Sequence, residues 1–217
     1  MHARLRVALG VAAACAIALA VAVAVAGHGG SGSLGLVGGF AGAQRPDSIP
    51  PEDFVLRDED GRPVHLRDYA GRVVVVTFLA STCRTACPVI AQQIRGALDQ
   101  LGHGVPALAV SVDPANDTRL SARRFLLAQS MLGRMSFLLG SAAQLGPVWR
   151  AFGIQPQIGS AAKNSDHTAY VVLIDRSGRQ RIGFPDSALT PEALAHDIRA
   201  LELERPPALA PRRVLLG

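Results

Sequence analysis

Residues 73–88 read VVVVTFLASTCRTACP, and this stretch decides the fold. Its first half is a short apolar, β-branched run, which predicts a buried strand over residues 73–78. Apolar residues then recur at helical spacing and predict a helix over residues 86–101. Cys83 and Cys87 therefore stand where a strand turns into a helix. They are four positions apart, so both sulfurs lie on one face if the first turn reaches back to Cys83.

The start of a helix favours thiolates, because its free backbone N–H groups and its dipole stabilise negative charge. Two such thiols within reach of each other can form a disulfide or hold a soft metal. A purely structural disulfide is a third interpretation, but structural bridges gain most when they join segments distant in the chain. The remaining cysteine, Cys15, lies in an apolar N-terminal run and is interpreted as an apolar filler.

The N-terminus predicts export. Residues 1–6 form a short leader with Arg4 and Arg6, and residues 7–26 carry no charge, which is long enough for a transmembrane helix. The basic leader predicts that the N-terminus is cytoplasmic and the domain extracytoplasmic. A cleaved signal peptide is the alternative, since residues 24–26 resemble a cleavage site. An apolar region longer than about 15 residues favours the uncleaved anchor.

Three further segments follow the membrane segment. Residues 27–51 are rich in glycine and serine and predict a flexible linker. Residues 52–204 predict one folded domain, and residues 205–217, with three prolines, predict a disordered tail. The net charge of +5 does not indicate a nucleic-acid partner, because the arginines are scattered and no aromatic residues interleave with them.

The predicted domain alternates strands with helices. A hairpin is expected first, with strands at 54–58 and 63–66 around a turn at 59–62. Beyond residue 101, further strands are expected at 105–112, 135–139, 168–175 and 180–184, and helices at 119–131, at 141–152 and from Pro191 onward. The helix at 119–131 is expected to begin at a cap, Asp117 or Thr118, and to bury Leu120, Phe125 and Leu126. This order predicts an α/β fold, thioredoxin-like, with an N-terminal β-hairpin and one preceding transmembrane helix.

These features together resemble the Sco/SenC family of membrane-anchored, thioredoxin-like copper proteins. The resemblance spans about residues 54–203 and rests on motifs in order. The first is Cys-x-x-x-Cys-Pro at 83–88, and the second is Ser-Val-Asp-Pro at 111–114, with Asp-Thr at 117–118. The third is Asp-His-Thr at 166–168, which leads into Tyr170 and then into residues 175–178. One departure is Arg84, which stands where the family usually has proline.

The resemblance implies that Cys83, Cys87 and His167 ligate a copper ion. It also implies delivery of copper to the binuclear site of cytochrome c oxidase, or reduction of the cysteines of that site. The partner would be the copper-site subunit of the oxidase or another copper or thiol protein. Two thiolates and one imidazole form a soft, three-coordinate set that suits Cu(I), whereas a structural zinc site normally has four protein ligands.

An exported thiol–disulfide oxidoreductase that uses Cys83 and Cys87 is the alternative, and a thiol peroxidase ranks third. Thioredoxin-type enzymes space their cysteines by two residues rather than three and need no histidine at position 167. The spacing and His167 therefore favour copper, while Arg84 beside Cys83 would stabilise a thiolate and favour redox work. Asp113 is interpreted as a turn residue or as a neighbour of the cysteines. Whether the protein is an enzyme stays open.

Overall fold

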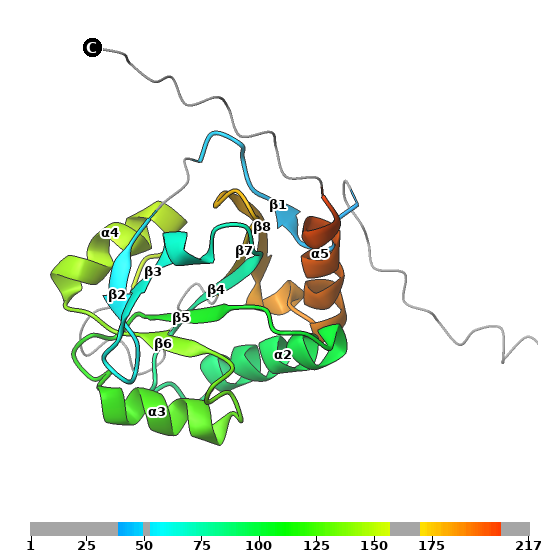
Figure 1. Cartoon of the computed structure of the whole chain (residues 1–217). Coiled ribbons are helices and arrows are strands. Elements are labelled where there is room, and N and C mark those ends of the chain that lie inside the picture. Colours follow the sequence, from blue (N-terminus) through cyan, green and yellow to red (C-terminus); the bar gives the residue numbers. More distant parts are fainter. Residues whose placement is uncertain (1–38, 50–52, 157–169, 205–217) are drawn as a thin grey trace, which may run out of the picture. The chain divides into compact units, whose positions relative to one another are not determined.

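The structure is a computed structural model that describes residues 39–49, 53–156 and 170–204 (Figure 1). The strands are β1 (Ala43–Gln44), β2 (Val55–Arg57), β3 (Pro63–His65), β4 (Val74–Leu79), β5 (Ala107–Ser111), β6 (Ser136–Leu138), β7 (Tyr170–Ile174) and β8 (Gln180–Pro185). The α-helices are α2 (Ala86–Leu101), α3 (Arg119–Ala128), α4 (Ala142–Phe152) and α5 (Pro191–Leu203). The prediction of an α/β fold is confirmed.

In the described part of the chain, six strands form one mixed sheet in the order β1-β8-β7-β4-β5-β6. Strand β4 pairs in parallel with β5 and β5 in parallel with β6, while β7 pairs antiparallel with β4 and β8. Every residue of β4 is buried. Burial on both faces explains why this strand reads as a continuous apolar run instead of alternating.

Helices cover both faces of this sheet. Figure 1 shows α2 and α5 side by side on one face, where they pack on each other, with α4 and the β2–β3 hairpin on the other. Alternate residues of β4 form one apolar cluster with α4 and the hairpin: Val74, Val76, Phe78, Leu145, Val148, Trp149, Phe152, Phe54, Leu56 and Val64. This packing places the end of β4 and the start of α2 on a rigid frame.

The predicted hairpin is confirmed as β2 and β3, which pair antiparallel. It joins the edge of the main sheet, because Arg57 and Leu139 exchange two backbone hydrogen bonds, at 3.2 and 2.7 Å. Two helices also begin at capping residues that the sequence predicts. Thr118, not Asp117, caps α3 with a capping box, and Ser141 caps α4 in the same way.

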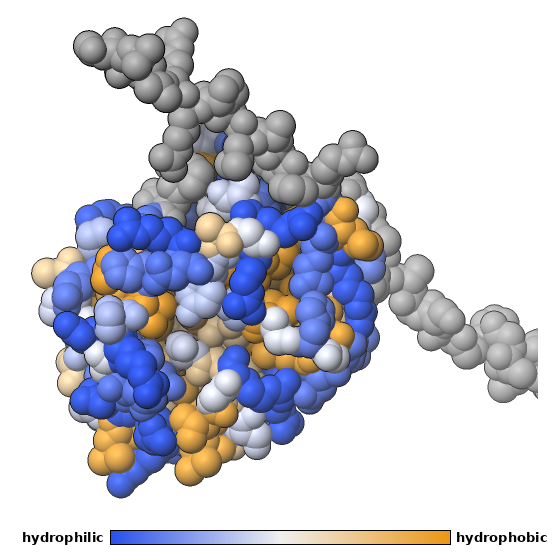
Figure 2. All heavy atoms as spheres, viewed as in Figure 1, coloured by the Kyte–Doolittle hydropathy of each residue, from blue (hydrophilic) through white to orange (hydrophobic). Residues whose placement is uncertain are grey.

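One core prediction is wrong. Leu120 was expected to face the core, but it is 58% exposed, as is Leu127 at 65%, while Phe125 and Leu126 are buried. Leu120 and Leu127 are seven positions apart, so they share the outward face of α3. Hydrophobic atoms accordingly reach the surface over α3 in Figure 2. The apolar character of Leu120 did not reveal that this face of α3 is exposed among the described residues.

The predicted linker differs from the structure at its C-terminal end. Residues 39–49 contact the domain, and β1 within them pairs antiparallel with β8. The predicted leader, membrane segment and tail lie outside the described residues, as do most of the loop expected at 153–166 and the predicted start of strand 168–175. No helix within the described ranges is long and apolar enough to cross a membrane.

Candidate metal centre

The two cysteines lie where the sequence predicts them, between β4 and α2. Cys87 belongs to the first turn of α2, and Cys83 precedes that helix in a turn closed by its own N–H, which donates to the carbonyl of Ala80 at 3.2 Å. The backbone N–H of Cys87 donates to Sγ of Cys83 across 3.4 Å. Cys83 is half-buried, whereas Cys87 is 1% exposed, and both are free thiols. The two sulfurs are therefore neighbours although the helix does not reach back to Cys83.

The pair is electrostatically asymmetric. Hydrogen bonds from the thiol and backbone of Cys87, with help from Thr85, outweigh burial and lower the pKa of Cys83 to about 4 from its ordinary value of 9.0. The hydrogen bond to Cys83 and burial raise the pKa of Cys87 far above its ordinary value. At neutral pH the site therefore holds one thiolate at the surface and one protonated thiol beneath it.

A buried carboxylate supports the loop that leads to Cys83. Oδ1 of Asp117 accepts hydrogen bonds from the backbone N–H of Ser81 at 2.7 Å and from its hydroxyl at 2.5 Å. Oδ2 of Asp117 accepts from the hydroxyl of Ser111, at the end of β5, at 2.6 Å. Burial raises the pKa of Asp117, and the bonds from Ser111 and Ser81 oppose that rise. Sequence reasoning gave Asp117 only a capping role. The available signal was that Ser81 and Ser111 stand where two buried strands end, so their polar groups need partners.

Asp113, interpreted from the sequence as a turn residue or as a neighbour of the cysteines, accepts from the N–H of Asn116 in the turn after β5 and also contacts the loop before Cys83. Its Oδ2 accepts from the hydroxyl of Thr82 at 3.3 Å, and both carboxylate oxygens accept from the side-chain amide of Asn116. Arg84 and Thr82 are exposed beside Cys83. Exposed polar residues thus precede and follow Cys83 in the chain, while its own half-buried side chain packs against the apolar cluster under the sheet.

The third predicted ligand, His167, lies outside the described residues. Strand β7 begins three positions later and pairs with β4, the strand that leads to the cysteines. Within the described ranges, no three His, Cys, Asp or Glu side chains cluster in a way that could hold a metal ion. The joining of Cys83, Cys87 and His167 into one site therefore stays a prediction.

The fold and the thiol pair define a thioredoxin-like domain with two neighbouring cysteines at the start of its first long helix. The model of the SCO1/SenC family matches residues 42–202, so the chain belongs to this family. This match confirms the family resemblance found in the sequence. It includes β1, at residues that the sequence alone assigned to a linker.

Three relatives illustrate the similarity. The chain is 28% identical over 153 residues to the mitochondrial protein SCO2 homolog of Bos taurus, covering 68% of this chain and 55% of that one. It thus spans about half the length of that curated relative. The structure of Bradyrhizobium japonicum ScoI with copper bound is 26% identical, with a TM-score of 0.57 over 70% of this chain and 98% of that one. BsSco, described as a member of the Sco family of cytochrome c oxidase assembly proteins, matches at 20% identity with a TM-score of 0.64, over 74% of this chain and 97% of that one. The thioredoxin-like prediction agrees with these solved folds.

Proposed function

We propose that this protein is a copper metallochaperone that holds one copper ion with Cys83, Cys87 and His167. The main support for the proposal is the contact between the N–H of Cys87 and Sγ of Cys83. It places the Cys83 thiolate, whose pKa is lowered, next to the thiol of Cys87. Thiolates are the ligands that Cu(I) prefers, and binding would displace the proton of Cys87. The imidazole of His167 would complete the coordination and fix its geometry.

The recipient follows from family membership. Sco proteins are cytochrome c oxidase assembly proteins, so we infer that this chain passes copper to the copper-site subunit of that oxidase or to a similar copper or thiol protein. The half-buried position of Cys83 supports transfer, since a recipient thiolate can reach the outer sulfur while Cys87 holds the ion from beneath. Transfer then proceeds by exchange of one ligand at a time.

Copper titration of the reduced full-length chain in detergent tests this proposal. We expect one copper ion per chain, loss of stable binding in Cys83→Ser and Cys87→Ser, and binding at least about 10-fold weaker in His167→Ala. His103→Ala is the matched control, because His103 is an exposed histidine paired with Glu202. If His167→Ala binds copper as tightly as the wild type, His167 is not a ligand of the copper ion.

A second function, thiol–disulfide exchange, is favoured by the asymmetry of the pair. The Cys83 thiolate would attack a partner's disulfide and form a mixed disulfide, releasing one partner thiolate. Cys87, after losing its proton to solvent, would attack Sγ of Cys83 and release the second partner thiolate. The partner gains two electrons, and the chain keeps a Cys83–Cys87 disulfide. In this function His167→Ala should leave the exchange rate nearly unchanged, whereas Cys83→Ser abolishes it.

We also propose that residues 7–26 anchor the chain in a membrane, with the domain on the extracytoplasmic side. The support is the uncharged 20-residue run after Arg4 and Arg6. A reporter that is active only in the cytoplasm, fused to the C-terminus, should give no signal. The same fusion without residues 1–26 should be active. A bright signal from the full-length fusion contradicts this topology.

A further inference from the structure

The outward side of α3 carries two leucines with an arginine between them. Leu120, Arg124 and Leu127 stand at positions i, i+4 and i+7, so their side chains share one side of the helix. All three are exposed, whereas Phe125 and Leu126 on the opposite side are buried (Figure 2). We name Leu120, Arg124 and Leu127 the α3 stripe. Exposed apolar side chains that gather on one element are typical of an interaction surface.

The α3 stripe is also positively charged. Helix α3 contains three arginines, and none of its residues is acidic. Arg119 donates to two backbone carbonyls of the turn between β2 and β3, and Arg123 pairs with Asp60 at 2.5 Å. Arg124 has no ion-pair or hydrogen-bond partner among the residues that the structure describes. Its charge is therefore available to a carboxylate from another molecule.

The start of α3 lies against the loop that carries the outer cysteine. The hydroxyl of Ser81, two positions before Cys83, donates to the hydroxyl of Ser121, next to Leu120, across 2.8 Å. Arg84, directly after Cys83, is a second exposed arginine without a partner in the described part of the chain. A protein that covers the start of α3 therefore lies beside the cysteine loop and meets positive charge on both.

We propose that the α3 stripe is the docking surface for the protein that exchanges copper with Cys83, and that this partner presents a carboxylate between two apolar side chains. This inference rests on the proposed function. Leu120 and Leu127 are about 10 Å apart along the helix axis, which sets the spacing of the partner's apolar side chains. Burial of the leucines supplies affinity, while the charge of Arg124 steers the approach of an acidic surface.

Two other occupants fit the α3 stripe less well. In a symmetric pair of antiparallel α3 helices, Leu120 of one copy meets Leu127 of the other, which brings the two copies of Arg124 together near the twofold axis. Repulsion between these like charges opposes such a dimer. A membrane surface is the other occupant. The chain enters the described domain through β1, at one edge of the sheet, whereas α3 contacts β6 at the other edge, about 24 Å away.

Copper transfer tests the inference. The donor is the copper-loaded full-length chain in nanodiscs of zwitterionic lipid, and the acceptor is the soluble domain of the copper-site subunit of the oxidase. We expect Arg124→Glu to slow transfer about 10-fold at low salt and less at high salt, because salt screens the attraction. The pair Leu120→Ser with Leu127→Ser should slow transfer about 10-fold at both salt concentrations. Wild-type rates in either variant would overturn the inference.

Matched controls come from exposed residues elsewhere in the domain. Arg150 on α4 is an exposed arginine without a partner among the described residues, and Leu203, the last residue of α5, is 86% exposed. Arg150→Glu and Leu203→Ser should transfer copper at the wild-type rate. Equal slowing in these controls and in the stripe variants would show a general effect of surface charge or polarity and would overturn the inference.

Docking is separable from copper binding. The stripe variants should bind copper with wild-type affinity and should release it to dithiothreitol, a small uncharged thiol that needs no docking surface, at the wild-type rate. Slower release to dithiothreitol would place the effect in the copper site and overturn the inference. If the wild type passes no copper to the subunit domain, the proposed function fails and the inference with it. If stripe variants pass copper as fast as the wild type, the function stands and the docking surface alone is overturned.

Hydrogen exchange identifies the occupant without copper. In the metal-free chain in zwitterionic nanodiscs, the amides at residues 120–128 should exchange more slowly when the subunit domain is added. Slowing that needs only anionic lipid in the nanodisc would assign the stripe to the membrane. A wild-type dimer in detergent that becomes a monomer in the leucine pair would assign it to a second copy of this chain. Either result overturns the inference.

Discussion

The backbone N–H of Cys87 points at Sγ of Cys83 from 3.4 Å away, so the first turn of α2 holds the outer sulfur in place. The same helix start buries Cys87 against the sheet. One short helix end therefore orients both sulfurs and sets their different protonation states. A metal that binds both must displace the proton of the inner one, and an attacking disulfide meets the outer one first.

Replacing the inner thiol tests this account of ionisation. In Cys87→Ala, Cys83 loses the thiol donor that lowers its pKa most, so the pKa of Cys83 should rise from about 4 toward its ordinary value. Cys87→Ser keeps a hydroxyl donor and should raise it less. Thiolate absorbance against pH measures both. An unchanged titration in Cys87→Ala would mean that the backbone N–H of Cys87 and the bonds from Thr85 suffice to stabilise the thiolate.

Asp117→Ala should destabilise the loop before Cys83. The substitution removes a buried acceptor from the N–H of Ser81 and from the hydroxyl of the buried Ser111, while the hydroxyl of Ser81 keeps its bond to Ser121. We expect a loss of about 1–3 kcal/mol in the free energy of unfolding. Urea unfolding followed by the fluorescence of Trp149, the single tryptophan, measures it. Asp113→Ala, whose partners are exposed, should cost much less; equal losses would argue against a special role for Asp117.

Two leucines on α3 test which face of this helix packs into the core. Leu126 is fully buried, so Leu126→Ala should lower the free energy of unfolding by about 2–5 kcal/mol. Leu120 is 58% exposed, so Leu120→Ala should change it by no more than about 0.5 kcal/mol. The same unfolding assay measures both. A large loss in Leu120→Ala would mean that its face of α3 is covered in solution.

The sequence predicted well those features that depend on residues close together in the chain, such as single strands, single helices and helix caps. Strand β4 was found from its continuous apolar run and helix α2 from apolar residues at helical spacing. Capping uses nearby residues, so the cap of α3 was narrowed to Asp117 or Thr118 and that of α4 to Ser141. Contacts between distant positions left no such pattern. Asp117 supports Ser81 across 36 positions, and Arg45 reaches Phe152 and Tyr170 from a glycine-rich segment whose backbone is also bound by Asp197. The ligand role of His167 came from family resemblance and stays a prediction.

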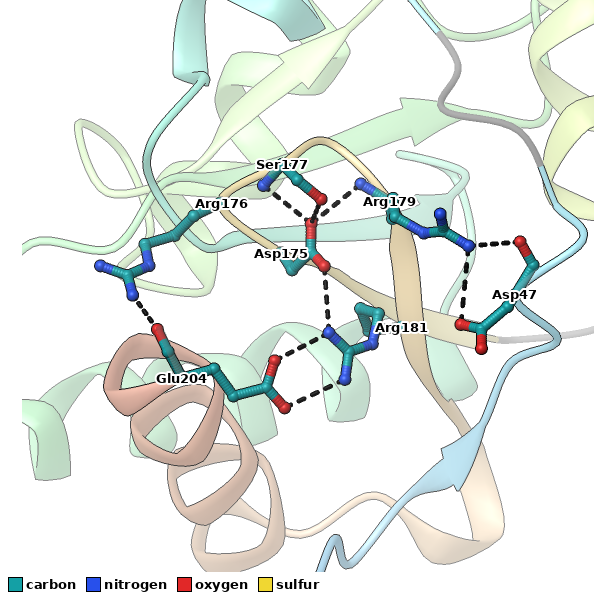
Figure 3. A network of polar contacts seen from close by, with 7 residues as sticks. All are labelled: Asp47, Asp175, Arg176, Ser177, Arg179, Arg181 and Glu204. Atoms are coloured by element: carbon teal, nitrogen blue, oxygen red, sulfur yellow. Dashed lines mark hydrogen bonds and ion pairs between the residues drawn. The ribbon is translucent and has the colours of Figure 1, made fainter. Parts of the chain in front are cut away.

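The turn between β7 and β8 carries a second carboxylate network. Oδ1 of Asp175 accepts from the N–H and hydroxyl of Ser177 and from the N–H of Arg179, and Oδ2 accepts from Arg181 at 3.1 Å. Arg181 also forms two bonds to the carboxylate of Glu204, just after α5, at 2.8 and 3.0 Å (Figure 3). Asp175 thus links the turn to the end of the last helix.

This network predicts how stability depends on acid. Burial raises the pKa of Asp175, but the bonds from Ser177, Arg179 and Arg181 outweigh it and hold the pKa below its ordinary value of 3.8. Because the folded pKa is the lower one, the contribution of this carboxylate is fully present above about pH 4 to 5 and is lost as pH falls through the folded pKa. Asp175→Asn should therefore be less stable than the wild type at pH 7, and the difference should shrink below about pH 4. Unfolding measured from neutral to acidic pH tests this, with Asp47→Asn, whose side chain is 92% exposed, as the control. A difference that stays constant with pH would show that the charge of Asp175 contributes nothing.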